Sequence, residues 1–401
     1  MSINKINLLS EESFINQQDT ENILLASIVQ KQINNQSASY TPNSWANVDA
    51  MVDLGIAKTA IDIGDQFSCS RNNEVITWDV IGHNCDILSD SKYAGRDNMT
   101  LYMHNQLPTT MQFDAREAFY VADEEIPENT TCYILIESQP WYTADQGKYA
   151  QFTLTQGLPV GGQIVFTHSH DTTMFEKTLS TYDSANATTA RETPTITEGS
   201  DGTKNLGTLK ENLIQANVNS CRRSFWGSHN YKTSAIRQWL NSNATAGNVW
   251  TPQTKFDRPP SWAATANGFM YGMDEDFLKV VKKTHIKTAR ISSFEGDALT
   301  FDEMDDYFFL LSKPQIYGGA TVSGVDEGEV YPYFKDYSDL NTAGSGEDSN
   351  RIKTRNGSAA WYWLRSPSPW NAHSVWNVNT SGSLYTNYAA IAAEVAAACT
   401  I

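Results

Sequence analysis

Alternation of apolar and polar residues dominates this chain, and helical spacing is confined to short stretches. Residues 74–84, EVITWDVIGHN, alternate as a half-buried strand does. Between residues 112 and 166, three further strand-like runs, CYILIE, YAQFTLTQ and GGQIVFT, are separated by turns. Residues 234–242, SAIRQWLNS, place their apolar side chains on one helical face behind a serine that can cap the helix. The pattern predicts an α+β protein with much irregular loop.

Three other stretches favour short helices. Residues 21–33, ENILLASIVQKQI, are amphipathic at helical spacing and can pack on a sister chain or on their own domain. Residues 44–57 form a helix with Ser44 as its cap and Gly55 near its end, and residues 274–284, DEDFLKVVKKT, form another. Short helices among many strands fit the same α+β class.

The C-terminal third is rich in strands. Residues 306–312, DYFFLLS, are typical of a buried strand, and residues 359–367, AAWYWLRSP, of an aromatic strand that ends at proline. Residues 374–385, SVWNVNTSGSLY, predict a hairpin with Ser381 and Gly382 in its turn.

Composition divides the chain into segments. SASYTPNS has the composition of a linker, so residues 1–40 are predicted as an N-terminal helical and linker segment and residues 41–401 as the main domain. The strand-like runs predict a small antiparallel β unit inserted in this domain at about 112–205.

Charge and cysteine usage restrict the partners. The formal net charge is −17, which repels a nucleic-acid backbone, and the basic stretch 277–290 is interpreted as a solvated strand or helix face. The five cysteines are scattered without a CxxC motif, which favours reduced thiols made in a cytoplasm. No long apolar run opens the chain or lies within it, so we expect no signal peptide and no membrane insertion.

The sequence carries no recognised catalytic motif. GxSxG, P-loop, HExxH and dinucleotide GxGxxG patterns are absent. His168 and His170 would share a strand face, but a metal site needs further ligands, and a solvent-facing pair is the alternative. Residues 302–306, DEMDD, lack the glycine turn of a calcium loop and are interpreted as an acidic turn. We therefore expect a protein that is not an enzyme and has no cofactor or metal.

Several blocks from about residue 44 onward occur in an order that we recognise: SAIRQWLNS, TKFDRPP, NGFMYGMDEDFL, YFFLLS, VYPYF, RIK and WYWLRSP. In this order the chain resembles the C-type-lectin-fold domain of the variable proteins of diversity-generating retroelements, which also occurs in phage tropism determinants. The resemblance implies a C-type-lectin-like fold with two helices and a twisted antiparallel sheet. In that family a reverse transcriptase copies a template RNA with errors at adenines, and the copy replaces the 3′ end of the gene.

The end of the chain, LYTNYAAIAAEVAAACTI, resembles the family ending, in which asparagine codons are the main targets and small residues between them are fixed. Ala389, Ala392, Val395, Ala396 and the final ACTI match fixed positions. Randomising the first two bases of AAC or AAT reaches every residue at the remaining positions, which are Tyr385, Thr386, Asn387, Tyr388, Ala390, Ile391 and Ala393.

The resemblance implies a variable, ligand-binding region at about 368–393. Upstream positions that also fit are Ser368, Asn371, Ser374, Asn377, Asn379, Thr380, Ser381 and Ser383. Trp370 and Trp376 cannot arise from an asparagine codon in this way, so they are fixed residues or come from another codon, and they are interpreted as aromatic members of the same surface. Glu394 and Ala397 depart from the family, which has Gly and Pro there, and glutamate would disturb a turn that needs a positive φ.

Adaptable binding surfaces combine rigid aromatic side chains with short polar neighbours. We expect Tyr385 and Tyr388 to be exposed, because their neighbours are too small to enclose them. The tryptophans expected in the core are Trp239, Trp361 and Trp363.

The function that the resemblance implies is display. The partner is a protein or glycan on the surface of a bacterial host, and the carrier is a phage tail or virion made in the host cytoplasm, or else a bacterial cell surface. Related tropism determinants assemble as trimers, so a homo-oligomer is included in this expectation.

Three alternatives remain. A Ca²⁺-dependent sugar lectin would need Trp-Asn-Asp with Glu-Pro-Asn or Gln-Pro-Asp, and the chain has none of these. An enzyme of the formylglycine-generating type would need paired reactive cysteines, for which Cys221 and Cys399 are the only partners. A structural virion subunit without a ligand is the third.

Overall fold

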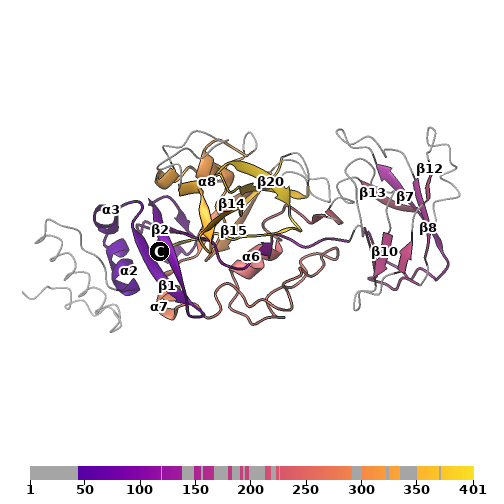
Figure 1. Cartoon of the computed structure of the whole chain (residues 1–401), viewed down its shortest axis with the longest axis horizontal. Coiled ribbons are helices and arrows are strands. Elements are labelled where there is room, and N and C mark those ends of the chain that lie inside the picture. Colours follow the sequence, from indigo (N-terminus) through magenta and orange to yellow (C-terminus); the bar gives the residue numbers. More distant parts are fainter. Residues whose placement is uncertain are drawn as a thin grey trace, which may run out of the picture.

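The protein is an α+β molecule in which small, mostly antiparallel sheets pack with short helices. The computed structural model describes residues 44–118, 120–137, 149–154, 157–166, 179–182, 190–192, 195–197, 213–217, 223–224, 226–290, 300–321, 325–334, 350–369 and 372–401. The predicted N-terminal segment, residues 1–40, lies outside these ranges. Figure 1 shows a main body with a separate group of strands to one side of it.

A four-stranded antiparallel sheet joins both ends of the main body. Its order is β1 (Gln66–Arg71), β2 (Glu74–His83), β4 (Met99–Met103) and β22 (Ala398–Thr400). The last strand pairs Cys399 with Leu101, so the end of the chain forms an edge strand of this sheet. All residues from Val395 to Ile401 are fully buried. The C-terminus is therefore part of the core.

The helices are short and are stabilised by side-chain caps. Ser44 caps α2 (Trp45–Asp53), Ser234 caps α6 (Ala235–Leu240) and Asp274 caps α7 (Glu275–Val280), each accepting a backbone N–H of the first turn. These three helices were predicted from sequence and are confirmed. Other helical segments in the described residues include α3 (Ala57–Ala60), α8 (Lys313–Tyr317), η2 (Ser91–Tyr93) and η4 (Pro332–Phe334).

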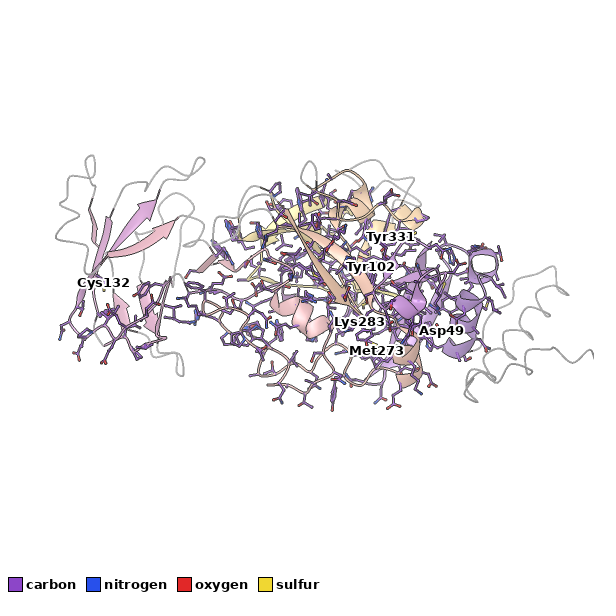
Figure 2. All side chains as sticks on the ribbon, turned by 180° about the vertical axis from the view of Figure 1, so that it is seen from behind. Asp49, Tyr102, Cys132, Met273, Lys283 and Tyr331 are labelled. Carbon is purple, nitrogen blue, oxygen red and sulfur yellow. The ribbon has the colours of Figure 1, made fainter. Side chains whose placement is uncertain are left out.

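Aromatic side chains fill the core between the helices and the first sheet. Trp78 of β2 lies 5.3 Å from the ring of Phe277 on α7, which in turn lies 4.5 Å from Trp45 on α2. Trp239 of α6 contacts Phe269 at 5.3 Å. Figure 2 shows Tyr102 and Tyr331 within this main body, while Cys132 lies in the strands beside it.

The basic and acidic stretches of the sequence form one hairpin. Strand β14 (Thr284–Arg290) pairs with β15 (Thr300–Asp306) and with the short β3 (Ile87–Leu88). The prediction of an acidic turn at 302–306 is wrong, because these residues lie in strand β15, where Glu303 is paired with Lys287 and Asp305 with His285 of β14. Lys287 approaches Glu303 at 3.5 Å, so a cross-strand ion pair joins the two stretches.

The predicted strand at 306–312 is only partly present. β15 ends at Asp306, and the residues from Phe308 to Ser312 are buried; among the described residues they form only an isolated bridge, between Phe309 and Ala398. The hydrophobic residues predicted burial correctly. Strand pairing could not be predicted in the same way, because it depends on which other segments lie beside these residues in the fold.

Smaller sheets complete the C-terminal half. β18 (Tyr362–Pro367), β19 (Ser374–Val378) and β20 (Leu384–Tyr388) form a three-stranded antiparallel sheet. The two-stranded pairs are β16 (Lys353–Arg355) with β17 (Ser358–Ala360), and β5 (Met111–Gln112) with β21 (Ala392–Ala393).

The inserted unit consists of two four-stranded sheets. Their orders are β11-β10-β9-β6 and β12-β8-β7-β13. The strands are β6 (Tyr120–Val121), β7 (Thr131–Glu137), β8 (Tyr149–Thr153), β9 (Gln163–Phe166), β10 (Leu179–Tyr182), β11 (Ala190–Glu192), β12 (Thr195–Thr197) and β13 (Leu213–Asn217).

The boundaries of this unit differ from the predicted 112–205. β5 at residues 111–112 belongs to the main body, and β13 at residues 213–217 still pairs with β7, in parallel. The unit contacts the main body near Phe256, whose carbonyl accepts a hydrogen bond from Ala118 N–H at 2.7 Å. Among the residues described, no helix has the length and apolar content needed to cross a membrane.

Candidate ligand-binding surface

The predicted variable region forms a hairpin and the turn that follows it. β19 and β20 pair from Ser374 with Tyr388 to Val378 with Leu384. At the tip, Asn379 Oδ1 accepts hydrogen bonds from the backbone N–H groups of Ser381 at 2.9 Å and Ser383 at 3.0 Å. Gly382 follows with φ 76°. The predicted hairpin and its turn are confirmed, and an Asx-type turn explains the asparagine.

Main-chain hydrogen bonds hold this segment on the rest of the protein. Ala390 N–H donates to Trp226 O at 2.7 Å, and Ala389 O accepts from Asp114 N–H at 3.0 Å. At the tip, the Tyr317 hydroxyl donates to Gly382 O at 2.6 Å. Each bond uses a backbone group of the hairpin or the turn. The support therefore does not depend on which side chains stand at the exchangeable positions.

Gly227 allows the turn after β20 to lie close to the main body. It has φ 85°, and a Cβ atom there would lie 2.8 Å from Ala115 O and 3.0 Å from Ala390 N. A side chain at this position would be strained and would also displace the backbone of the turn. The sequence WG at 226–227 gives no periodic signal, so this contact could not be predicted.

An aromatic stack lies at the end of β20. The rings of Tyr388 and Trp226 are 4.1 Å apart and nearly parallel, at 23°, and His373 lies 5.3 Å from Tyr388. Trp226 and Tyr388 are partly exposed, whereas Tyr385 is 61% exposed. The expectation that the two tyrosines reach the surface is therefore met. Trp226 and His373 were missed, because their contacts with Tyr388 arise only in the fold.

Exposure separates most exchangeable positions from fixed ones. In residues 384–401, side chains at six of the seven predicted exchangeable positions are partly or fully exposed: Tyr385, Thr386, Asn387, Tyr388, Ala390 and Ile391. Among the positions matching the fixed family residues, Ala389, Val395, Ala396 and residues 398–401 are buried, and Ala392 alone is exposed. A pattern of buried small residues and exposed variable ones therefore fits a stretch with neither helical nor strand periodicity.

Five of the predicted contact residues cannot contact a partner directly. Ser368, Ser374, Asn377, Ser383 and Ala393 are buried, with exposures of 0, 4, 1, 8 and 0%. Ser374 and Asn377 lie on β19, which is the central strand of its sheet between β18 and β20, and Ser368 N–H donates to Ser374 O at 2.8 Å. These residues are therefore not part of the contact surface; they belong to the buried layer that supports it.

The other upstream positions divide in three ways. Thr380 and Ser381 are exposed at the hairpin tip, and Asn379 beside them is partly exposed. Trp376 is partly buried and packs on the main core. Trp370 and Asn371 lie outside the described residues. The surface thus consists of the tip, β20 and the turn up to Ile391; we call it the hairpin surface.

The departures at Glu394 and Ala397 are accommodated by the core. Glu394 is 5% exposed and forms an ion pair with Arg355 at 2.7 Å. Its backbone does not adopt a positive φ, so glutamate causes no strain of the kind considered above. Ala397 is fully buried.

The Leu-Arg-Ser block of β18 anchors the sheet that carries the hairpin. The buried Arg365 guanidinium donates to Leu310 O and Glu327 O, both at 2.7 Å, and to Gln315 Oε1 at 2.6 Å. Ser366 Oγ donates to the buried Glu327 carboxylate at 2.8 Å. This network satisfies the buried backbone carbonyls of Leu310 and Glu327 and fixes β18 in place, which is a structural role.

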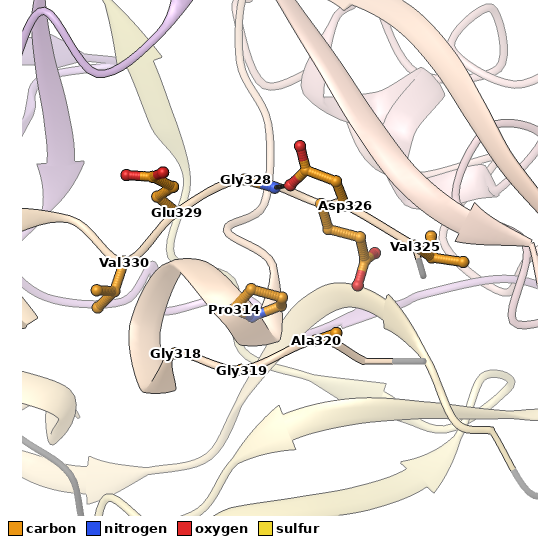
Figure 3. A pocket seen from close by; sticks show the side chains of 10 residues that line it. Pro314, Gly318, Gly319, Ala320, Val325, Asp326, Gly328, Glu329 and Val330 are labelled. Atoms are coloured by element: carbon orange, nitrogen blue, oxygen red, sulfur yellow. Dashed lines mark hydrogen bonds between the residues drawn. The ribbon is translucent and has the colours of Figure 1, made fainter. Parts of the chain in front are cut away.

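Two hollows lie near this network. Figure 3 shows one, of about 590 Å³, lined by Pro314, Gly318–Ala320 and Val325–Val330. The other, of about 490 Å³, is lined in part by Cys85, His285 and Glu329. The Glu327 carboxylate facing them already accepts hydrogen bonds from Ser366 and from Ala289 N–H at 2.9 Å. Its polar capacity is therefore used within the protein.

Support for metal ligands or reactive thiols is limited among the described residues. There, no group of three or more His, Cys, Asp or Glu side chains is placed to hold a metal ion. His168, His170 and Cys221 lie outside those ranges. Cys399 is fully buried, and burial raises the pKa of its thiol well above the ordinary value, so it stays protonated at neutral pH.

Comparison with known proteins gives one partial match. Residues 208–401 match the model of DUF6273, a domain family of unknown function. No curated protein and no solved structure matches the chain. The matched residues include the hairpin surface and the Arg365 network, so the chain is similar to DUF6273 proteins in the part that carries the candidate site.

Proposed function

We propose that this protein displays an exchangeable surface, the hairpin surface, to a target on the surface of a bacterial host cell. The fold proposed for the main body is the C-type-lectin-like fold implied by the sequence resemblance. The carrier proposed is a phage tail or virion, or alternatively a bacterial cell surface, and the assembled form is a homo-oligomer.

One observation carries this proposal. Within residues 384–401, six of the seven positions that resemble diversified codons lie at the surface of β20 and its turn, while the matching fixed positions, with one exception, are buried. Their backbone is held by hydrogen bonds that any side chain permits, such as Ala390 N–H to Trp226 O. Diversification of such a surface changes what it contacts and leaves the folded state unaltered.

The surface has the composition of an adaptable binding site. Tyr385 and Tyr388 supply large contact areas with few rotatable bonds, and Thr380, Ser381 and Asn387 supply short polar groups. In interfaces of this kind a few Tyr, Trp and Arg residues contribute about 2 kcal/mol or more each. We therefore expect the two tyrosines to contribute most of the binding free energy.

Binding to intact host cells tests the proposal. We expect Tyr385→Ala or Tyr388→Ala to weaken binding at least about tenfold, which corresponds to roughly 1.4 kcal/mol. Tyr271→Ala is a matched control, because Tyr271 is also exposed, at 37%, but lies outside the hairpin surface. EDTA should leave binding unchanged.

Other outcomes would assign a different function. Binding that survives loss of both tyrosines but disappears in EDTA would support a Ca²⁺-dependent lectin. Binding that survives both treatments would move the site away from the hairpin surface. Absence of any binding by the native assembly would favour a structural virion subunit.

A further inference from the structure

Strand β20 is the last strand of its sheet, so one of its edges faces away from β19. Hydrogen bonds at both ends of the hairpin establish which groups point outward: Asn379 N–H donates to Ser383 O, and Ala389 N–H donates to His373 O, both at 2.9 Å. Hydrogen-bonded and non-hydrogen-bonded pairs alternate along an antiparallel ladder. Leu384, Thr386 and Tyr388 therefore direct their backbone N–H and C=O groups outward.

The outward groups differ in whether they are already paired. Tyr388 N–H donates to Asn387 Oδ1 at 2.9 Å, and Tyr388 O accepts from Ile391 N–H at 3.0 Å. The outward N–H and C=O groups of Leu384 and Thr386 have no hydrogen-bond partner in the part of the chain that the structure describes. The free edge is thus short and ends where Asn387 covers the next amide.

This edge lacks the usual protection against pairing. Native edge strands are commonly protected by Lys, Pro, bulges or covering loops. The sequence of β20, LYTNY, contains no charge and no proline, and its pairing with β19 has no register shift. β-branched and aromatic residues of this kind favour a paired strand.

We propose that an extended segment of a target protein adds to the Leu384–Thr386 edge as a further strand. The inference rests on the proposed display function and narrows the target from protein or glycan to protein. An extended polypeptide presents N–H and C=O groups at the matching spacing, and a glycan does not. A second copy of this chain is the competing occupant of this edge, and the test below distinguishes it from a target segment.

Strand addition would explain how binding persists while side chains change. The backbone bonds at Leu384 and Thr386 are the same for every sequence variant except one with proline at position 386, which lacks the N–H. Tyr385 projects on one face of the added strand and Leu384 and Thr386 on the other, because side chains alternate along a strand. The constant edge supplies attachment, and the exchangeable side chains supply selectivity.

Thr386→Pro tests the edge directly. Proline removes the outward N–H of Thr386, and edge strands tolerate proline where the N–H faces solvent. Thr386→Ala is the matched control, since it shortens the same side chain and keeps the N–H. The probe is a displayed library of random short peptides, panned on the wild-type full chain; each enriched peptide is then measured on both variants, with circular dichroism to verify that both variants fold.

We expect Thr386→Pro to bind the enriched peptides at least about tenfold more weakly than Thr386→Ala, which also lacks the threonine side chain but keeps the N–H. Two versions of each peptide, N-methylated at either the odd-numbered or the even-numbered residues, provide a readout that needs no protein variant. Only the version whose methyl groups replace the N–H groups facing the edge should lose binding. Strand addition would be overturned if the enriched peptides bound Thr386→Pro as tightly as Thr386→Ala. It would also be overturned if panning on wild type enriched no peptide. A Thr386-dependent dimer of the chain would overturn it as well. If the tyrosine variants nevertheless lose binding to host cells, the proposed function stands without this inference.

Discussion

Trp363 connects the sheet of the hairpin to the strand pair beneath the following turn. It is fully buried, and its ring lies 5.7 Å from Phe113 in an edge-on arrangement and 5.2 Å from Trp361. Its Nε1–H donates to Met111 O at 3.0 Å. Met111 belongs to β5, which pairs with β21. We expect Trp363→Ala to destabilise the whole main body and not only its own strand.

The expected cost has two parts. Removing a buried tryptophan side chain costs about 3–5 kcal/mol in lost transfer free energy and cavity formation. The Met111 carbonyl loses its partner, which adds about 1–3 kcal/mol. The sum, about 4–8 kcal/mol, is comparable to the entire stability of an ordinary domain, about 5–15 kcal/mol.

Thermal and urea unfolding of three variants separates these parts. Trp363→Ala should be unfolded or only marginally stable, and Trp363→Phe, which keeps most of the ring but loses the hydrogen bond, should be intermediate. Trp361→Ala is the control, because Trp361 is partly exposed at the start of the same segment and should cost least. A soluble Trp363→Ala protein that unfolds cooperatively at the wild-type midpoint would refute the reasoning.

Three further expectations concern stability. Exchanging Tyr385, Thr386 and Ile391 together for Ser should cost within about 0.5 kcal/mol per position, whereas Ala393→Tyr, in a fully buried site, should cost about 1–3 kcal/mol. Thermal unfolding of both variants compares these costs, and equal stability of the two would contradict the assignment of exposed and buried positions. Gly227→Ala should cost about 1–3 kcal/mol through its positive φ and weaken host-cell binding, and unchanged unfolding would contradict this. Burial lowers the pKa of Lys353 from 10.5 to about 8, so between these values the unfolded chain binds more protons, and wild type should gain stability relative to Lys353→Met as pH rises through this window. Urea unfolding at both ends of the window measures the difference, and a constant difference would count against it.

Local signals predicted the helices and the hairpin well. Ser44 and Ser234 each cap the helix that begins after them, and Gly382 occupies the tip with the positive φ that such a turn needs. These features depend on residues near one another in sequence. The core position of Trp239 and Trp363 followed from their apolar neighbours in the same way.

Long-range pairing could not be predicted. DEMDD looks like an acidic turn in isolation, and its assignment to a strand depends on the basic strand β14 that lies opposite. The end of the inserted unit depends on β13 pairing with β7, which is remote in sequence. Likewise, the contact between Trp226 and Tyr388 brings together segments that share no local pattern.

The candidate surface was predicted by position and corrected by burial. The codon argument identifies residues that can be exchanged, but it does not say which of them point outward. Asn377 and Tyr385 are paired across the hairpin, yet Asn377 is 1% exposed and Tyr385 61%, because β18 lies beyond β19 whereas β20 is at the edge. Sheet order therefore decides which exchangeable positions can bind.

The central claim, that the hairpin surface is a diversified binding surface, is tested most directly by sequencing the DNA beside the gene. The account predicts a near-copy of codons 365–401, next to a reverse-transcriptase gene, with adenines at the codons of Tyr385, Thr386, Tyr388, Ala390 and Ile391. Codons for the buried Val395 and Ala396 should be identical in both copies. The absence of such a copy, or mismatches concentrated at the buried codons, would contradict the account.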